Sequence, residues 1–165
     1  MIINGKDLLD LAPIENMRKT KINDKGVSYG LTECGYDIRL KQTIVFERES
    51  FGPSFHSIDG GRMIEGHFAL GSSIEKFNMP SILMGRVLNK STWARKGLDA
   101  SLTTNIEPGW KGHLTIELVF HKYGRLVIPA GSGICQIIFE GLTCPAHYKG
   151  KYQDQKDEPV DGYFA

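Results

Sequence analysis

The chain has no excess of charge of one sign and no long hydrophobic run. Its 165 residues carry 20 Lys and Arg against 19 Asp and Glu, which gives a formal net charge of +1. Proteins that bind nucleic acid through its phosphates usually have a basic excess, so the composition argues against a nucleic-acid partner. No apolar run approaches the length of a membrane-spanning segment, and no membrane partner is expected.

Cysteine is scarce and unpaired in its spacing. The three cysteines are Cys34, Cys135 and Cys144, an odd number, and no charged leader precedes an apolar stretch at the N-terminus. Secreted disulfide frameworks need paired cysteines. The sequence therefore predicts a reduced compartment, the cytoplasm, or the host cytoplasm if the protein is viral. The length fits one domain with its own core, so residues 1–165 are predicted to form a single domain.

Short strand patterns dominate the chain. One helix is predicted at residues 6–11, where Leu8, Leu9 and Leu11 form an apolar side before Pro13. Strand-like segments separated by glycine and proline turns are at residues 35–40, 43–46, 67–70, 81–87, 113–120, 126–129 and 134–139. This pattern is typical of an all-β protein with a short N-terminal helix. Residues 49–66 are interpreted as an excursion, and the polar residues 149–165 are expected to be mobile unless another subunit orders them.

The segment at residues 113–120 alternates apolar and polar residues, which indicates a half-buried strand. Glu117 lies on its polar side, next to Val119 on the same side. In one interpretation Glu117 is a solvated strand glutamate, because Glu is rarely buried without a partner. In the other, this side lines a cleft, and Val119 helps to desolvate the carboxylate and raise its pKa toward that of a general base.

A cationic hydroxyl cluster, Lys90, Ser91, Thr92 and Arg95, follows the strand-like residues 81–88 in a turn or short helical segment. Arg binds phosphate oxygens bidentately and Lys acts as a point charge, so the cluster suits a phosphate group. The alternative is structural, with Ser91 capping a short helix and Arg95 in a surface ion pair.

Several motifs occur in the order found in one known family. They are YGLTECGYDIRL at residues 29–40 with Asp37, KSTWAR at 90–95, GWKG at 109–112, LTIE at 114–117, ICQIIF at 134–139 and YKGKYQDQ at 148–155. Together they resemble the dCTP deaminases of the trimeric dUTPase-like superfamily over most of the chain. The resemblance implies a distorted β-barrel or jelly-roll-like fold and a homotrimer with sites at subunit interfaces. The implied reaction is hydrolytic deamination of dCTP to dUTP.

The resemblance also implies roles for individual residues. Glu117 would be the general base, Ser91 would position the attacking water, and Arg95 would bind the triphosphate with Lys90 and Thr92. Glu107, one methylene longer than the usual aspartate, would bind the sugar hydroxyl. The late segments would contact base or phosphates through Gln136, Tyr148, Lys151 and Gln155, with the tail closing over the nucleotide. The remaining positions expected to line the site are Trp93, Ala94, Thr103, Thr115 and Ile116.

Two of these residues also have a purely structural interpretation. In it, Tyr148 simply packs against its neighbours, and Gln136 is a buried strand glutamine whose hydrogen-bonding groups are satisfied.

A zinc mechanism is not expected. Zinc deaminases use a His-x-Glu segment and a Pro-Cys-x-x-Cys segment, and neither occurs in the sequence. No tightly bound cofactor is predicted, although Mg²⁺ is expected to accompany the triphosphate.

Three other functions remain open. A bifunctional enzyme would deaminate dCTP and then release pyrophosphate to give dUMP, and it would keep both acidic positions. A dUTP diphosphatase is less compatible, since dUTPases typically have an apolar residue at the position of Glu117 and a glycine-rich motif in the tail that DEPVDGYFA lacks. A silent nucleotide-binding regulator is disfavoured because Ser91, Arg95 and Glu117 are all present. dTTP is a possible inhibitor, as it is for some relatives.

Overall fold

The computed structural model describes residues 1–24 and 26–164. They form two short helices, α1 (Gly5–Leu11) and α2 (Ser91–Arg95), and a set of mostly short strands. The strands are β1 (Ile2–Ile3), β2 (Lys21–Asp24), β3 (Val27–Leu31), β4 (Tyr36–Arg39), β5 (Ile44–Arg48), β6 (Ser54–Ile58), β7 (Ile64–Glu65), β8 (Phe68–Asn78), β9 (Leu83–Asn89), β10 (Leu98–Asp99), β11 (Asn105–Ile106), β12 (Lys111–Phe120), β13 (Gly124–Ile128) and β14 (Gly133–Gly141). The predicted all-β class and the N-terminal helix are confirmed.

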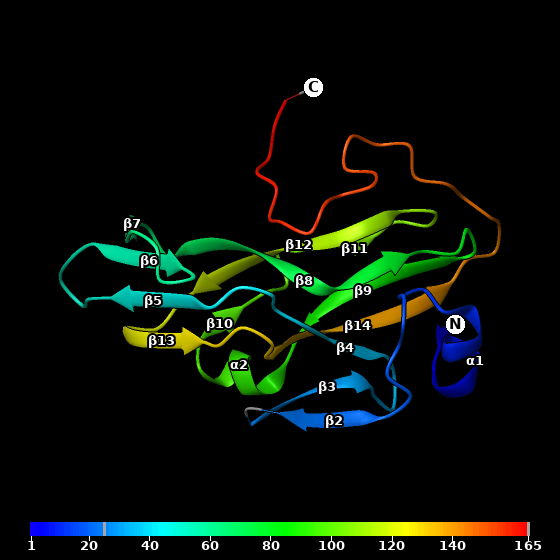
Figure 1. The fold of residues 1–165 in the computed structure, drawn as a ribbon, viewed down its shortest axis with the longest axis horizontal. Helices are drawn as coiled ribbons and strands as arrows, with labels where there is room; N and C mark the ends of the chain where they lie inside the picture. Colours follow the sequence, from blue (N-terminus) through cyan, green and yellow to red (C-terminus); the bar gives the residue numbers. More distant parts are fainter. Residues whose placement is uncertain (25, 165) are drawn as a thin grey trace.

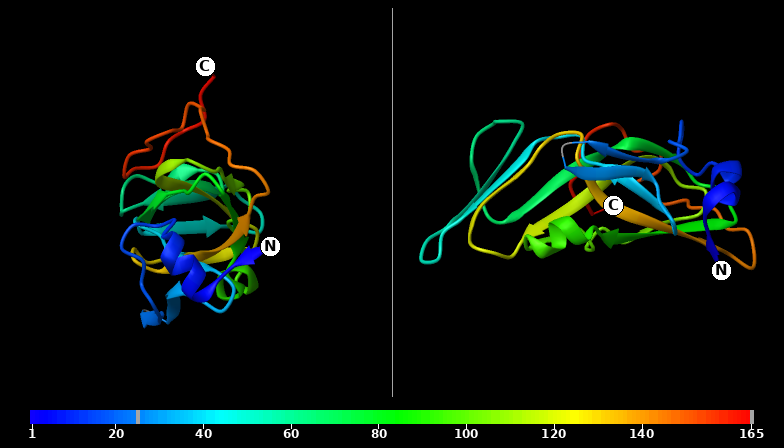
Figure 2. Two further views of the ribbon diagram at one scale, coloured as in Figure 1. Left: turned by 90° about the vertical axis from the view of Figure 1, so that its right-hand side faces the viewer. Right: turned by 90° about the horizontal axis from the view of Figure 1, so that it is seen from below.

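Three antiparallel sheets make up a distorted, jelly-roll-like arrangement. The largest has the order β11-β9-β14-β4-β3-β2, with β1 also paired to β14. A second sheet has the order β10-β12-β8, and a third has the order β13-β5-β6-β7. Figures 1 and 2 show an elongated molecule with the third sheet at one end and α1 at the other. No described helix is long and apolar enough to cross a membrane.

The core lies between the sheets and follows the strand alternation. On β12 the side chains of Leu114, Ile116, Leu118 and Phe120 are buried, while the residues between them are only half-buried. The predicted two-residue period of this strand is therefore confirmed. Burial of such side chains stabilises the fold by about 1.5–3 kcal/mol each, which fixes the face on which Glu117 lies.

The strand β8 is much longer than the predicted residues 67–70. It continues through Gly71, Ser72 and Ser73, a polar stretch whose two serines are fully buried. The amide of Ser72 donates to Gln42 Oε1 at 2.8 Å, and the hydroxyl of Ser73 accepts from the Leu114 amide at 2.9 Å. Because distant residues satisfy these buried polar groups, the strand does not end where the apolar pattern ends.

The predicted excursion at residues 49–66 contains β6, which pairs with β5, and β7, which pairs with β6. These strands form an arm at the end of the molecule rather than an irregular loop (Figure 1). Apolar alternation is weak here because much of the segment is exposed.

The polar tail is ordered by its own chain, contrary to the expectation that a second subunit is needed. The His113 amide donates to the Gln155 carbonyl at 3.0 Å, and Trp110 Nε1 donates to the Tyr152 carbonyl at 2.6 Å. Lys41 Nζ contacts Asp157 Oδ2 at 2.5 Å. Figure 1 shows the tail, in orange and red, folded back beside β12 and β11. The tail has no apolar pattern, and backbone and side-chain hydrogen bonds hold it against the rest of the chain instead.

Candidate active site

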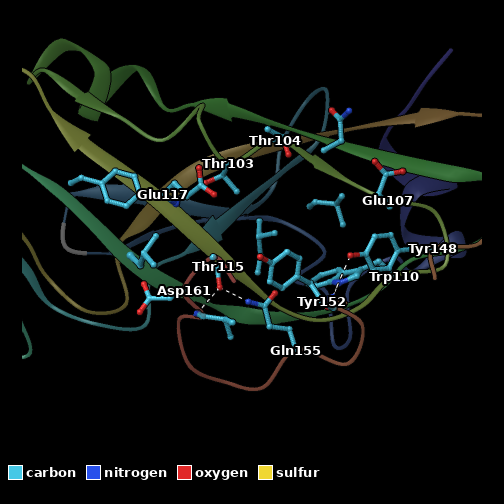
Figure 3. A pocket seen from close by; sticks show the side chains of 17 residues that line it. Thr103, Thr104, Glu107, Trp110, Thr115, Glu117, Tyr148, Tyr152, Gln155 and Asp161 are labelled. Carbon is cyan, nitrogen blue, oxygen red and sulfur yellow. Dashed lines mark hydrogen bonds between the residues drawn. The ribbon is translucent and has the colours of Figure 1, made fainter. Parts of the chain in front are cut away.

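A cavity of about 590 Å³ opens between β12, the turn before β11 and the returning tail. This volume is within the usual range for small-molecule sites, about 300–1,000 Å³. Five of the predicted site residues line it: Glu107, Thr115, Glu117, Tyr148 and Gln155. In Figure 3, Glu117 and Glu107 lie at opposite ends of the cavity, with Thr115 and Gln155 between them.

Glu117 is held in a partly desolvated position. Burial raises the pKa of its carboxyl above the ordinary value, which agrees with the second of the two interpretations of this strand, in which its polar side lines a cleft. Its cross-strand partner is Leu70, which lines the same cavity. An apolar neighbour keeps water away from the carboxylate and disfavours its charged form. Such a carboxyl is suited to accept a proton and return it near neutral pH.

Thr103 fixes the backbone at Glu117. The strand β10 pairs with the end of β12 only at Leu98 and Asp99, and then the chain turns away. The hydroxyl of the buried Thr103 accepts a hydrogen bond from the Glu117 amide at 2.7 Å. This hydroxyl takes the place of a strand carbonyl, so the edge of β12 can face a cavity without a buried, unpaired N–H.

The tail closes one side of the cavity through Thr115. The Thr115 hydroxyl accepts hydrogen bonds from Gln155 Nε2 and, at 3.1 Å, from the Val160 amide. Gly112 makes the close approach possible: its φ is +137°, and a Cβ there would lie 2.6 Å from the Gln155 nitrogen. The tail therefore packs against β12 only because position 112 has no side chain.

The other end of the cavity is aromatic. Trp110 and Tyr152 line it together with Tyr148, whose amide donates to the Pro108 carbonyl at 2.7 Å. The Tyr148 hydroxyl accepts from the Tyr152 amide at 3.3 Å. Tyr148 thus has the predicted place at the cavity and also the packing role considered as its alternative.

The KSTWAR cluster is not brought to this cavity within one chain. Ser91, Thr92, Ala94 and Arg95 are exposed on α2. In Figures 1 and 2, α2 and the C-terminal tail lie on opposite sides of the molecule. None of the four lines the cavity that contains Glu117.

The remaining predicted residues lie elsewhere. Lys90 is paired with Asp37, and Lys151 Nζ contacts the Tyr163 carbonyl near the chain end. Gln136 Nε2 donates to Thr32 Oγ1 at 3.0 Å, in agreement with the interpretation as a satisfied strand glutamine. The side chains of Trp93 and Ile116 are buried in the core, so only their backbone groups can reach a ligand.

Sequence reasoning gave no role to several residues that shape the site. Trp110 and Tyr152 occur in motifs without a role of their own, and Thr103 is expected only to line the pocket, which it does. Their contributions depend on contacts with distant residues, such as the hydrogen bond from Trp110 Nε1 to Tyr152 across 42 positions. Within residues 1–24 and 26–164, no three His, Cys, Asp or Glu side chains are grouped so that they could hold a metal ion.

The three-sheet architecture and the cavity beside β12 define a protein of the dUTPase-like fold class. The structure is similar to the dUTPase of EIAV, with a TM-score of 0.52 at 14% identity, covering 84% of this chain and 91% of that one. It is also similar to the 2′-deoxycytidine 5′-triphosphate deaminase of Agrobacterium tumefaciens, with a TM-score of 0.54 at 18% identity. That alignment covers 84% of this chain but 47% of the Agrobacterium chain, so this protein spans about half its length.

Residues 3–142 match the dCTP deaminase-like family model. The chain belongs to the dCTP deaminase-like family. It is 35% identical over 167 residues to the dCTP deaminase of Campylobacter jejuni, which covers 91% of this chain and 89% of the relative. It is also 35% identical over 150 residues to the dCTP deaminase of Chlamydia pneumoniae, which covers 81% of this chain and 78% of the relative.

Proposed function

We propose that this protein catalyses the hydrolytic deamination of dCTP to dUTP and ammonia. The observation that carries the proposal is the Glu117 carboxyl, whose pKa is raised by burial at one end of a nucleotide-sized cavity. Membership of the dCTP deaminase-like family supports the choice of substrate.

The reaction needs a base, an acid and a held water molecule. The Glu117 carboxylate takes a proton from water, and the resulting hydroxide adds to C4 of the cytosine ring. Glu117 gives this proton to the ring nitrogen N3, then takes the proton of the new C4 hydroxyl and passes it to the departing amine. The bond from C4 to the amino nitrogen breaks, ammonia leaves, and a C4 carbonyl remains beside a protonated N3. One water molecule is consumed for each ammonia released.

A second copy of the chain completes the site in this proposal. Ser91 and Arg95 are exposed on α2 and do not line the pocket of their own chain. We place them at the pocket of a neighbouring subunit in a homotrimer, where Ser91 positions the water and Arg95 binds the triphosphate with Thr92. Glu107, at the far end of the pocket, binds the sugar hydroxyl, and Gln155 contacts the base or phosphates from the tail.

No resident metal is part of this proposal, and Mg²⁺ accompanies the triphosphate as part of the substrate. The location is the cytoplasm, which the three unpaired cysteines support. dTTP is a candidate inhibitor because it carries the same triphosphate.

A bifunctional enzyme is the second candidate. Glu107 and Glu117 both line the cavity, so a second acidic group is available for pyrophosphate release. Incubation with dCTP and with dUTP, with ammonia and pyrophosphate assayed separately, distinguishes the two. Ammonia from dCTP with no pyrophosphate from either substrate supports the deaminase. Ammonia from dCTP together with pyrophosphate from dUTP supports the bifunctional enzyme. Pyrophosphate from dUTP with no ammonia from dCTP would identify a dUTP diphosphatase instead.

Removal of zinc is expected to leave activity unchanged. A transition-metal chelator takes away Zn²⁺, but the proposed water activation depends on Glu117 rather than on a metal. The assay restores Mg²⁺ after chelation, because the triphosphate substrate binds it. Loss of activity that only zinc reverses would contradict this mechanism.

The substitution Arg95→Ala is expected to weaken dCTP far more than deoxycytidine. An arginine that binds phosphate contributes nothing to a substrate without phosphate, so kcat/KM for dCTP should fall by about 10–100-fold, equivalent to one or two charge-assisted hydrogen bonds. Arg62, an exposed residue before β7, provides the control variant Arg62→Ala. Equal losses on both substrates would mean that Arg95 supports the fold instead.

A further inference from the structure

Lys90 is buried, although it belongs to the cationic cluster that suggested phosphate binding. Its side chain is 11% exposed and is paired with Asp37, which is 3% exposed. Lys90 Nζ also donates to Ser28 Oγ at 3.2 Å, and Ser28 Oγ lies 3.5 Å from the same Asp37 oxygen. The ammonium is thus held by β3 and β4, whereas Ser91 and Arg95 beside it are exposed.

The helix α2 needs such a support. It has five residues, and its N-cap, Lys90, makes no side-chain hydrogen bond to the helix backbone. Isolated helices of this length are unstable in water, so tertiary contacts have to hold α2 in place. Besides the Lys90 pair, Trp93 Nε1 donates to the Gly133 carbonyl at 2.7 Å, and Lys122 Nζ donates to the Arg95 carbonyl at 2.7 Å.

Gly133 shows that the region around the pair is tightly packed. A Cβ at position 133 would lie 2.0 Å from the Ser28 carbonyl oxygen and 3.6 Å from the Cε carbon of Lys90. Asp37 Oδ1 is buried with no hydrogen-bond partner within the described part of the chain, so the Asp37 carboxylate depends on Lys90 and Ser28 alone. Removing Lys90 would leave a buried charge without compensation.

We propose that Asp37 is a positioning residue that acts through Lys90 to set the place of Ser91 and Arg95. This inference rests on the proposed deaminase function. It gives Lys90 an anchoring role in place of phosphate binding, and it gives Asp37 a role that no motif assigned. The ion pair links β4, which lies next to β14 in the large sheet, to the residues that α2 presents to a neighbouring pocket.

The test is a double-mutant cycle with Asp37→Asn, Lys90→Met and the double variant. Stability is measured as Tm, and kcat and KM for dCTP are measured well below the lowest Tm. Each single variant is expected to lower Tm by about 10 °C, because it leaves an unpaired group in the interior. Each should also lower kcat and raise KM, with kcat/KM down about 10–100-fold. The double variant should have a Tm and a kcat/KM no lower than those of the more strongly affected single variant.

Two outcomes would overturn the proposal. If Lys90 binds phosphate, Lys90→Met raises KM for dCTP, Asp37→Asn leaves KM unchanged, and their effects add. If the pair only supports the fold, Tm falls while kcat and KM of the folded protein stay at wild-type values.

Milder variants and a control keep the test informative. Should a single variant fail to fold, the double variant, which removes both charges, and Ser28→Ala replace it. The matched control is the pair of Arg86 and Glu140 in the same sheet, at 2.5 Å, whose side chains are 54% and 29% exposed and so much less buried; it is substituted as Arg86→Met with Glu140→Gln. It should change neither Tm nor kinetics appreciably.

Failure of the deaminase function would be seen separately, as a wild-type protein that releases no ammonia from dCTP. Amide hydrogen exchange at residues 91–95 tests the anchor without any activity. Faster exchange in Asp37→Asn and Lys90→Met than in the Arg86 and Glu140 control supports the anchor, and unchanged exchange contradicts it.

Discussion

Glu117→Gln is expected to abolish deamination while dCTP still binds. The amide keeps the shape of the side chain and its place on β12, but it cannot take a proton from water. General acid–base groups contribute about 10²–10⁴-fold to rates, so kcat should fall by at least that factor with little change in the dissociation constant. Ammonia release and equilibrium binding of dCTP measure the two effects separately.

The control for this substitution is Glu65→Gln, at an exposed glutamate on β7, which should retain full activity. Turnover by Glu117→Gln within about tenfold of the wild type would remove Glu117 from the role of base. A variant that no longer binds dCTP would instead show that the carboxylate holds the substrate.

The pH profile should report the environment of Glu117. Its pKa is raised by burial, and the carboxylate is the active form, so kcat should fall as the pH drops through that raised pKa, above the ordinary range of glutamate. Leu70→Asn, opposite Glu117 on β8, should admit water and move this acidic limb to lower pH. The same limb in both proteins would contradict desolvation as the cause.

Mixing two variant proteins is expected to restore activity when each variant lacks a residue that a different subunit contributes to the same active site. Glu117→Gln is expected to be inactive alone, and Arg95→Ala is expected to retain only about 1–10% of the wild-type kcat/KM for dCTP. In a randomly mixed trimer at equal ratio, one site in four pairs an intact Glu117 with an intact Arg95 of its neighbour, so about a quarter of wild-type activity should return. Ammonia release after subunit exchange measures this recovery.

The structure also supplies the matched control for this mixing. Gln155 lines the same pocket as Glu117 in the same chain, so Glu117→Gln mixed with Gln155→Ala should regain nothing. Recovery with Gln155→Ala but not with Arg95→Ala would mean that the tail, rather than α2, is the shared element. A monomer by light scattering at micromolar concentration would exclude the trimer.

Local patterns in the sequence were sufficient for the elements that have one apolar side. The alternation on β12 predicted which residues are buried and that Glu117 faces away from the core, and α1 ended near Pro13 as expected. Both predictions depend only on side-chain periodicity and backbone sterics. They therefore needed no knowledge of distant partners.

Features that depend on contacts between residues far apart in the sequence could not be predicted from such patterns. The burial of Glu75 depends on Arg39, whose Nε lies 2.8 Å from Glu75 Oε1 across 36 positions. The length of β8 and the fold of the tail have similar causes. The sequence groups Lys90 and Arg95 in one phosphate cluster, yet in the structure Lys90 is largely buried against Asp37 while Arg95 is exposed.

The tail also protects a sheet edge. Along β12, one side pairs with β8 and the far end pairs with β10, while near Lys111, Gly112 and His113 the other side is covered by Gln153 and Gln155 of the tail. Under the proposed function, a tail that lifts to admit a nucleotide would make backbone groups of β12 available to a foreign strand. A chain truncated before Gln155 should therefore tend to aggregate, and a bound nucleotide that keeps the tail down should act as a protectant against aggregation.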